Sequence, residues 1–247
     1  MGATLTIDIG NTSLKWGVWE SGTLVERGAT PHRATVSEIP EPWRKATRVG
    51  VASVARTISD RFSETWSSEL PPLERFTDYR DLPVELSTAI SDPGGVGVDR
   101  LLNVLAWGSA HPGEAAILVD FGTAITLDLS TAEGVFAGGQ ILPGAELLAR
   151  ALGANTALLP EVAIEPGGEV IGTDTESAIV SGVSGLILGG VERQIADLLR
   201  VFDRNARVVA TGGGAALWTP HLPSIERIIP DLTLRGIVRA LEAREEA

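Results

Sequence analysis

Apolar residues gather in three short stretches at the start of the chain, separated by small polar residues. Residues 4–9 form an apolar run that contains Asp8, and residues 14–20 and 23–28 follow across turns at 10–12 and 21–22. Short apolar runs bounded by Gly, Asn and Ser are typical of β-strands joined by tight turns. The pattern predicts a three-stranded meander.

The rest of the first half predicts one further strand and two helices. Residues 49–55 predict a buried strand, and residues 60–69 have helical spacing that ends at a Pro-Pro pair. Residues 98–110 predict a strong amphipathic helix, which His-Pro-Gly at 111–113 stops. We place a domain boundary there.

The second half repeats the plan of the first. It has predicted strands at 116–119, 125–129, 134–141 and 207–210, and predicted helices at 145–152 and 175–199. The segment Asp120–Ala124 aligns with Asp8–Thr12 at an offset of 112 residues, close to half the chain. This predicts a duplicated α/β domain, divided into residues 1–114 and 115–247.

The composition is that of a globular protein and disfavours several classes of partner and chemistry. Hydrophobic residues make up 44% and charged residues 21%, as in ordinary globular proteins. The net charge of −12 repels nucleic acid but does not exclude a mononucleotide held by backbone N–H groups. The absence of cysteine excludes disulfides and thiolate chemistry. No basic, apolar leader or 18-residue apolar span is present, so we expect a cytoplasmic protein without a membrane partner.

An aspartate followed by a glycine turn occurs at the end of a predicted strand in both halves, at Asp8 and Asp120. Glycine lets backbone N–H groups approach a phosphate, and a carboxylate can hold magnesium or its waters. A single Asp-x-Gly is usually only a strand-to-turn signal. Two matched copies, with Lys15 and the turn Thr211–Gly214, favour a phosphate site.

These residues belong to a set of motifs that resembles the type III pantothenate kinases, relatives of sugar kinases, acetate kinase and actin. The motifs run in order as Asp8–Lys15, Gly97–Arg100, Asp120–Thr126, Gly138–Gly144, Asn155–Pro160, Ile171–Thr175 and Thr211–Gly213. The resemblance implies two duplicated ribonuclease-H-like domains of the actin-like ATPase fold. Each would be a mixed five-stranded sheet flanked by helices, with a cleft between the two.

The resemblance also assigns candidate site residues. Asp99 is the expected catalytic base, since a primary alcohol must lose its proton as it attacks the γ-phosphate. Asp8 is the expected magnesium ligand, directly or through water, and Asp120 the ligand of potassium or ammonium. ATP contacts are implied at Asp8, Gly10, Asn11, Thr12, Lys15, Thr123, Gly212 and Gly213. Substrate contacts are implied at Ile90, Gly97, Val98, Arg100 and Thr175.

Several of these residues have structural alternatives. Asp99 could simply cap the helix that begins near Arg100, and Thr175 could cap the helix at 176–190. Arg100 could pair with the carboxylate of the substrate or form a surface salt bridge. Glu242–Glu246 predict a solvated, frayed end, and the tryptophans predict core or dimer contacts.

The implied reaction is the phosphorylation of pantothenate by ATP, the first step of coenzyme A synthesis, in a homodimer with the substrate site near the interface. One position departs from the family pattern, because Ile90 stands where many members carry a tyrosine. This keeps two alternatives open: a non-catalytic homologue that binds nucleotide or pantothenate, and a kinase for another small hydroxy-acid.

Overall fold

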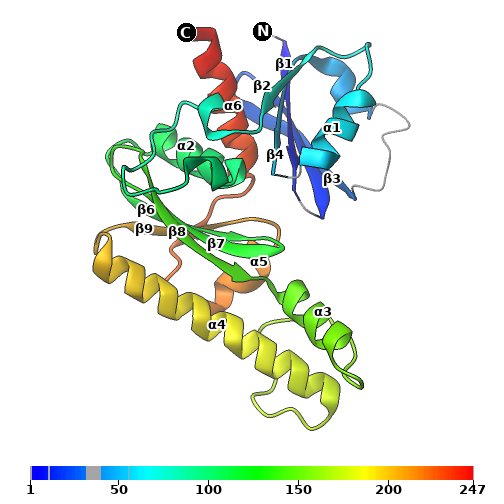
Figure 1. The fold of residues 1–247 in the computed structure, drawn as a ribbon, viewed down its shortest axis with the longest axis vertical. Helices are drawn as coiled ribbons and strands as arrows, with labels where there is room; N and C mark the ends of the chain where they lie inside the picture. Colours follow the sequence, from blue (N-terminus) through cyan, green and yellow to red (C-terminus); the bar gives the residue numbers. More distant parts are fainter. Residues whose placement is uncertain (1, 11, 32–39, 55, 247) are drawn as a thin grey trace. The chain divides into compact units, whose positions relative to one another are not determined.

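The computed structural model describes residues 2–10, 12–31, 40–54 and 56–246. The chain forms two compact units (Figure 1). The first contains Met1–Pro112, Gly134–Phe136 and Leu232–Ala247, and the second contains Gly113–Glu133 and Ala137–Asp231. The C-terminal segment therefore packs within the first unit, whereas a division at 114/115 assigns it to the second half.

The sheet of the first unit has the order β3-β2-β1-β4-β5 in the part of the chain that is described. Its strands are β1 (Ala3–Ile9), β2 (Ser13–Glu20), β3 (Thr23–Pro31), β4 (Ala46–Ser53) and β5 (Leu73–Phe76). The first three pair antiparallel, which confirms the meander, and β4 and β5 add in parallel. The strand predicted at 49–55 begins earlier and ends earlier than its apolar run suggested, and β5 was not predicted.

The second unit repeats this order as β8-β7-β6-β9-β10. Its strands are β6 (Ala116–Phe121), β7 (Ala124–Ser130), β8 (Phe136–Pro143), β9 (Arg207–Thr211) and β10 (Arg227–Ile228). β6 pairs antiparallel with β7 and parallel with β9, as β1 does with β2 and β4. The predicted duplication into two mixed five-stranded sheets is confirmed.

One face of the first sheet is covered by α1 (Arg56–Glu64) and the short helix Glu41–Lys45, around an aromatic cluster. Trp43 lies at its centre and contacts Trp16, Phe62 and Trp66. The helix predicted at 60–69 is wrong at both ends. Its last turn ends at Glu64, where the hydroxyls of Ser63 and Thr65 donate to helix carbonyls.

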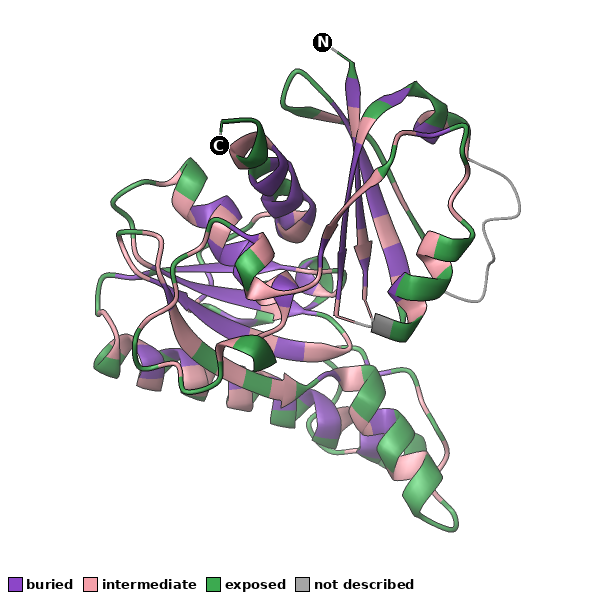
Figure 2. Ribbon diagram, turned by 45° about the horizontal axis from the view of Figure 1, so that its top comes forward, coloured by how far each residue is buried: buried purple, intermediate pink, exposed green. Residues whose placement is uncertain are grey.

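The other face of this sheet carries α6 (Leu232–Glu246), which also packs along α2 (Val98–Ala110). Figure 2 shows the buried stripe of α6. Gly50 permits the close approach, since a Cβ there would stand 2.6 Å from Ile237 and 2.9 Å from Leu241. Six glycines of the described segments have a positive φ, and Gly50 is not one of them, so its role here is to leave space and not to allow an unusual backbone conformation.

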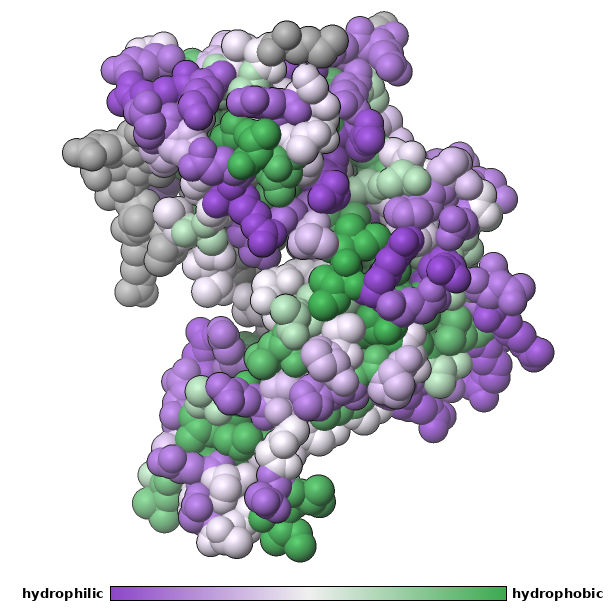
Figure 3. Space-filling view, turned by 180° about the vertical axis from the view of Figure 1, so that it is seen from behind, coloured by the Kyte–Doolittle hydropathy of each residue, from purple (hydrophilic) through white to green (hydrophobic). Residues whose placement is uncertain are grey.

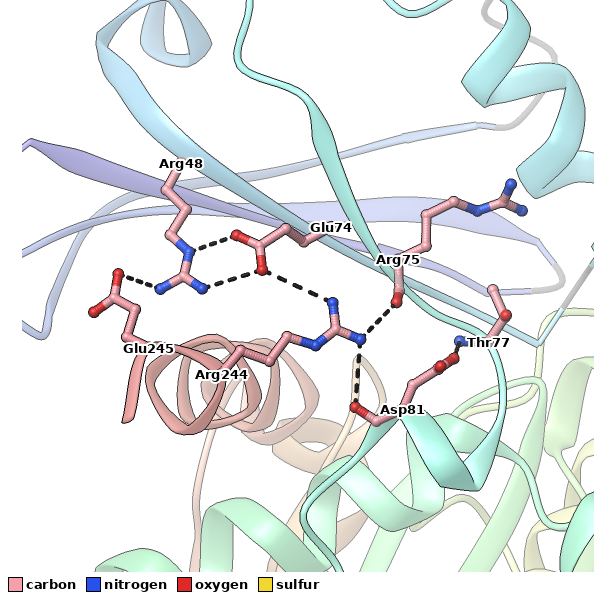
Figure 4. A network of polar contacts seen from close by, with 7 residues as sticks. All are labelled: Arg48, Glu74, Arg75, Thr77, Asp81, Arg244 and Glu245. Atoms are coloured by element: carbon pink, nitrogen blue, oxygen red, sulfur yellow. Dashed lines mark hydrogen bonds and ion pairs between the residues drawn. The ribbon is translucent and has the colours of Figure 1, made fainter. Parts of the chain in front are cut away.

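Polar contacts fasten the C-terminal part of α6 to the sheet (Figure 4). Arg48 on β4 donates to both carboxylate oxygens of Glu74 on β5 and pairs with Glu245. Arg244 lies over the ring of Phe76, 4.1 Å from its centroid, and donates to the carbonyl of Arg75 at 3.1 Å. The frayed end predicted for Glu242–Glu246 is wrong, because α6 continues to Glu246. The prediction that this end is solvated is confirmed, since residues 244–246 are exposed.

The second sheet packs one face against α4 (Thr175–Val201), which runs beyond the sheet beside α3 (Ala145–Asn155) in Figure 1. Val119, Leu127 and Val191 are fully buried in this core. The short helices α5 (Ala215–Trp218) and Thr219–His221 follow β9. In the described ranges, no helix combines the length and apolarity needed to cross a bilayer.

Candidate functional site

The first glycine turn lies at the carboxyl end of β1. Asp8 pairs in register with Lys15 on β2 and with Ala52 on β4. Directly opposite residues of neighbouring strands point to the same face with Cβ atoms about 5 Å apart, so Asp8 and Lys15 project from the same face of the sheet. The Gly10 N–H donates to the carbonyl of Ser13 at 3.2 Å. Thr12 is exposed, and Asn11 lies outside the described residues.

The start of α2 lies at the same end of this sheet. Its N-cap is Gly97, and Asp99 is the second helical residue, so the alternative that Asp99 is the cap is wrong. Asp99 Oδ1 accepts a hydrogen bond from the Arg100 N–H at 2.9 Å. A Cβ at position 97 would stand 2.5 Å from Asp99 Oδ1 and 3.5 Å from Val54, the residue after β4. Glycine at 97 thus leaves the space that the carboxylate occupies.

Arg100 is partly buried, and its guanidinium lies 5.4 Å from the ring centroid of Phe136. Phe136 is itself fixed in the first unit, because its N–H donates to the Glu85 carbonyl and its carbonyl accepts from the Ser87 N–H, both at 2.9 Å. Stacking on an aromatic face orients a guanidinium without neutralising it. The aromatic contact therefore holds a cation one residue from Asp99.

The two other candidate substrate residues near α2 are Val98 and Ile90. Val98 is 3% exposed, so its side chain belongs to the core and only its backbone can contact a substrate. Ile90 is partly buried, and its N–H donates to the Ser87 carbonyl at 3.0 Å. Ser87 thus joins the segment of Ile90 to the strand of Phe136.

The second glycine turn lies at the carboxyl end of β6 and repeats the geometry of the first. Asp120 pairs with Thr126 on β7 and with Thr211 on β9. Gly212 follows with φ of +91°, and a Cβ there would stand 2.2 Å from Asp120 Oδ1 and 2.7 Å from the Phe121 carbonyl oxygen. This arrangement makes a cradle that only glycine can complete. Gly213 is exposed with open space where a side chain would be.

Thr123 sits in this second turn and connects it to α3. Its carbonyl accepts from the Gly144 N–H at 3.0 Å, and a Cβ at 144 would stand 2.5 Å from that oxygen. Gly144 is the N-cap of α3, so the first turn of this helix contacts the glycine turn directly. Sequence reasoning missed Gly144 and Thr126 as parts of this site. The internal repeat contained the signal for Thr126, since Lys15 and Thr126 hold equivalent positions opposite Asp8 and Asp120.

Thr175 is the first residue of α4 and is exposed. The N-cap is Asp174, which forms a capping box with Ser177, so the alternative that Thr175 caps the helix is wrong. The Ser177 N–H and hydroxyl lower the pKa of Asp174 below its usual range. Thr175 lines an open hollow of about 430 Å³ between α3 and α4, whose other walls are Leu152, Leu159, Ala178, Ile179, Gly182 and Val183. Of the residues that line this hollow, Thr175 alone has a polar side chain.

The donor set of the first turn suits a magnesium ion that is shared with a phosphate. Among the residues that the structure describes, no three His, Asp or Glu side chains come together as a metal cluster. Magnesium at nucleotide sites keeps several waters and touches only one or two carboxylates besides the phosphates. The single carboxylate of Asp8, beside the Gly10 turn, fits such an ion.

Comparison with known proteins gives consistent matches over nearly the full chain. The family model described as type III pantothenate kinase matches residues 4–197. Type III pantothenate kinases of Rhizorhabdus wittichii and Dehalococcoides mccartyi are 34% and 32% identical to the chain. Each alignment covers 94% of this chain and 95% of the relative.

A solved structure has the same fold at much lower identity. The activator of the 2-hydroxyisocaproyl-CoA dehydratase from Clostridium difficile, with bound ADPNP, superimposes with a TM-score of 0.52 and 13% identity. The match covers 99% of this chain and 98% of that one. Together with the strand orders, this shows two duplicated ribonuclease-H-like domains.

Proposed function

The chain belongs to the type III pantothenate kinase family, and we propose that it transfers the γ-phosphate of ATP to the 4′-hydroxyl of pantothenate. This is the first step of coenzyme A synthesis, and it fits the cytoplasmic location expected from the sequence. The observation that carries the proposal is the matched pair of turns at Asp8 and Asp120, together with Asp99 at the start of α2.

We assign the proton transfer to Asp99. The Asp99 carboxylate accepts a hydrogen bond from the Arg100 N–H at Oδ1, which orients it at the helix N-terminus. The positive end of the α2 dipole stabilises a negative charge in this turn. An oriented carboxylate can accept the proton of the pantothenate hydroxyl as the bond to phosphorus forms.

We assign the phosphates of ATP to the glycine turns and to Lys15. Lys15 would supply a positive charge opposite Asp8, and the turns that contain Gly10, Thr12, Thr123, Gly212 and Gly213 would supply backbone donors. The expected contact of Asn11 lies outside the described residues. Asp8 would hold magnesium through water, and Asp120 would hold potassium or ammonium. When bound, these ions neutralise charge on the transferring phosphate.

We assign the carboxylate of pantothenate to Arg100, because the Phe136 ring presents its guanidinium one residue from the proposed base. Gly97 and Val98 would contact the substrate through their backbone, and Ile90 through apolar contact in place of a phenol. Losing one neutral hydrogen bond costs about 1 kcal/mol, which weakens binding but does not abolish catalysis.

The test is ADP release that depends on both ATP and pantothenate, with magnesium and potassium present. We expect turnover by the wild type and a loss of at least about 100-fold in kcat for Asp99→Asn. Asp60→Asn is the matched control, since Asp60 makes only a surface ion pair with Arg75. Equal rates for the wild type and Asp99→Asn would refute the assignment. Calorimetric binding without turnover would point to a binding homologue, and turnover only with another acceptor to a different hydroxy-acid kinase.

We propose that two copies associate through the end of the second unit that carries α3 and the start of α4. Large apolar side chains are exposed there, and Figure 3 shows hydrophobic residues grouped over this segment. The most exposed are Leu158 (90%), Val170 (90%) and Ile171 (79%). Apolar surface of this kind marks interfaces. Thr175 would then contact substrate beside the interface.

Sedimentation velocity tests this association. We expect a dimer for the wild type and a monomer for the double variant Leu158→Asp, Val170→Asp. Val25→Asp is the control, because Val25 is 51% exposed on β3 of the first unit. A wild-type monomer at micromolar concentration would contradict the proposal.

A further inference from the structure

We propose that Thr233 and Asn103 form a positioning pair, through which the C-terminal helix α6 sets the place of α2 and thereby of Asp99. This inference rests on the proposed function, because it concerns the base of that reaction. Neither residue lies in the glycine turns or the substrate motif. Their role would be to hold the base and not to touch the substrate.

Asn103 occupies a position of α2 where an apolar residue would be the norm. It is 1% exposed and lies between buried leucine and valine positions of the same helix. Its Oδ1 accepts a hydrogen bond from the Thr233 hydroxyl at 3.0 Å. Burying an amide requires such partners, so the bond fixes how α2 and α6 meet.

Asn103 and Asp99 share one face of α2, because residues four apart stack along a helix. Asn103 therefore stands one turn below the proposed base, on the same side. A hydrogen bond at Asn103 fixes both the rotation of α2 about its axis and its position along that axis. The rotation and the axial position of α2 together set the location of the Asp99 carboxylate.

The backbones of the two helices meet directly beside this bond. A Cβ at Gly236 would stand 2.2 Å from the Leu102 carbonyl oxygen. Glycine at 236 thus lets α6 lie against the backbone of α2, in the turn that contains Asn103. With so little space, a shift of one helix moves the other.

α6 is in turn fixed to the strands that carry the Asp8 turn. The side chains of Ile237 and Leu241 pack on Gly50 of β4. The side chain of Leu234 packs on Gly17 of β2, 3.4 Å from the position that a Cβ of residue 17 would take. The contacts of Arg48, Glu74 and Arg244 hold the far end of α6 (Figure 4). α6 therefore links α2 to the sheet and fixes the distance between Asp99 and Asp8. Phosphoryl transfer is sensitive to such spacing, since a misplacement of about 1 Å can cost 100-fold in rate.

The experiment compares Thr233→Val, which keeps the shape but removes the hydroxyl, with Thr233→Ser, which keeps the hydroxyl. We expect Thr233→Val to lower kcat about tenfold or more while KM for ATP stays within about twofold. Thr233→Ser should restore most of kcat. Thr47→Val is the matched control, because its hydroxyl bonds the Ala3 carbonyl within the same unit and away from α2.

Hydrogen exchange of the α2 amides gives a second readout, which needs no substrate. We expect faster exchange at residues 100–104 in Thr233→Val than in Thr47→Val or the wild type. Unchanged exchange, an unchanged kcat, or an equal loss in Thr233→Ser would each overturn the positioning role. An inactive wild type would instead refute the proposed function, and the exchange data would then decide the link between the helices by themselves.

Discussion

Gly212 presses against Asp120 so closely that a methyl group at position 212 would stand 2.2 Å from the carboxylate Oδ1. The same glycine has a φ of +91°, a conformation that residues with a side chain rarely adopt. Position 212 therefore combines two separate demands for glycine, one from the backbone and one from the neighbouring acid.

We expect Gly212→Ala to weaken ATP binding by about tenfold or more, because the methyl group must displace the Asp120 carboxylate. Backbone strain alone costs about 1–2 kcal/mol at such a position. Gly113→Ala separates the two effects, since Gly113 has a φ of +84° with nothing within 4 Å of its Cβ position. Calorimetric titration with a non-hydrolysable ATP analogue measures the difference. Equal affinities for the two variants would contradict a site at Asp120.

Asp120→Asn should remove activation by potassium, since an amide lacks the charge that favours a bound cation. We expect the wild-type rate to rise with potassium at constant ionic strength and the variant to show little response. Sodium or choline at the same concentration is the control salt. A variant that keeps the full potassium response would show that the cation binds elsewhere.

The chain has two lysines, Lys15 and Lys45, and only the first lies in the proposed phosphate site. We expect ATP with magnesium to protect Lys15 from amine-directed acetylation and to leave Lys45 reactive, as measured by mass spectrometry of peptides. Lys15→Met should raise KM for ATP about tenfold through loss of the charge, whereas Lys45→Met should not, because Lys45 is exposed. Equal protection of the two lysines would count against the assignment.

The hydrogen bond from Arg48 holds the pKa of Glu74 below its ordinary value, with further lowering from the nearby charges of Arg48 and Arg244. A carboxyl whose pKa is lowered by folding stabilises the protein above its unfolded pKa and loses that contribution as the pH falls through the folded value. We expect the urea midpoint of the wild type to fall more than that of Glu74→Gln between about pH 6 and pH 3. Parallel curves for the two proteins would show that this ion pair contributes nothing.

The sequence predicted the strands near the glycine turns well because tight turns and apolar runs are local signals. The bounds of α2 were predicted correctly at Val98 and Ala110, where a glycine precedes and His-Pro-Gly follows. β5 and α6 were not predicted, since each depends on partners far away in the sequence. Arg48 and Glu245, for example, are 197 residues apart.

The candidate site shows the same limit. Asp8, Lys15, Asp99, Asp120 and Gly212 could be named from motifs. The capping residues could not, because Asp99 and Thr175 were both acceptable caps by residue type. Only the backbone at each helix start shows that Gly97 and Asp174 hold those positions. The role of Asn103 could not be predicted from its own position in the sequence, because it depends on the hydrogen bond from Thr233, which lies 130 residues away.

The place of α6 has a consequence for the order in which the protein can fold. A ribosome makes this helix after all of the second unit, yet its residues complete the core of the first. Until then, the first unit lacks the side chains of Ile237 and Leu241 that pack on Gly50. The first unit therefore cannot complete its packing until α6 has been synthesised.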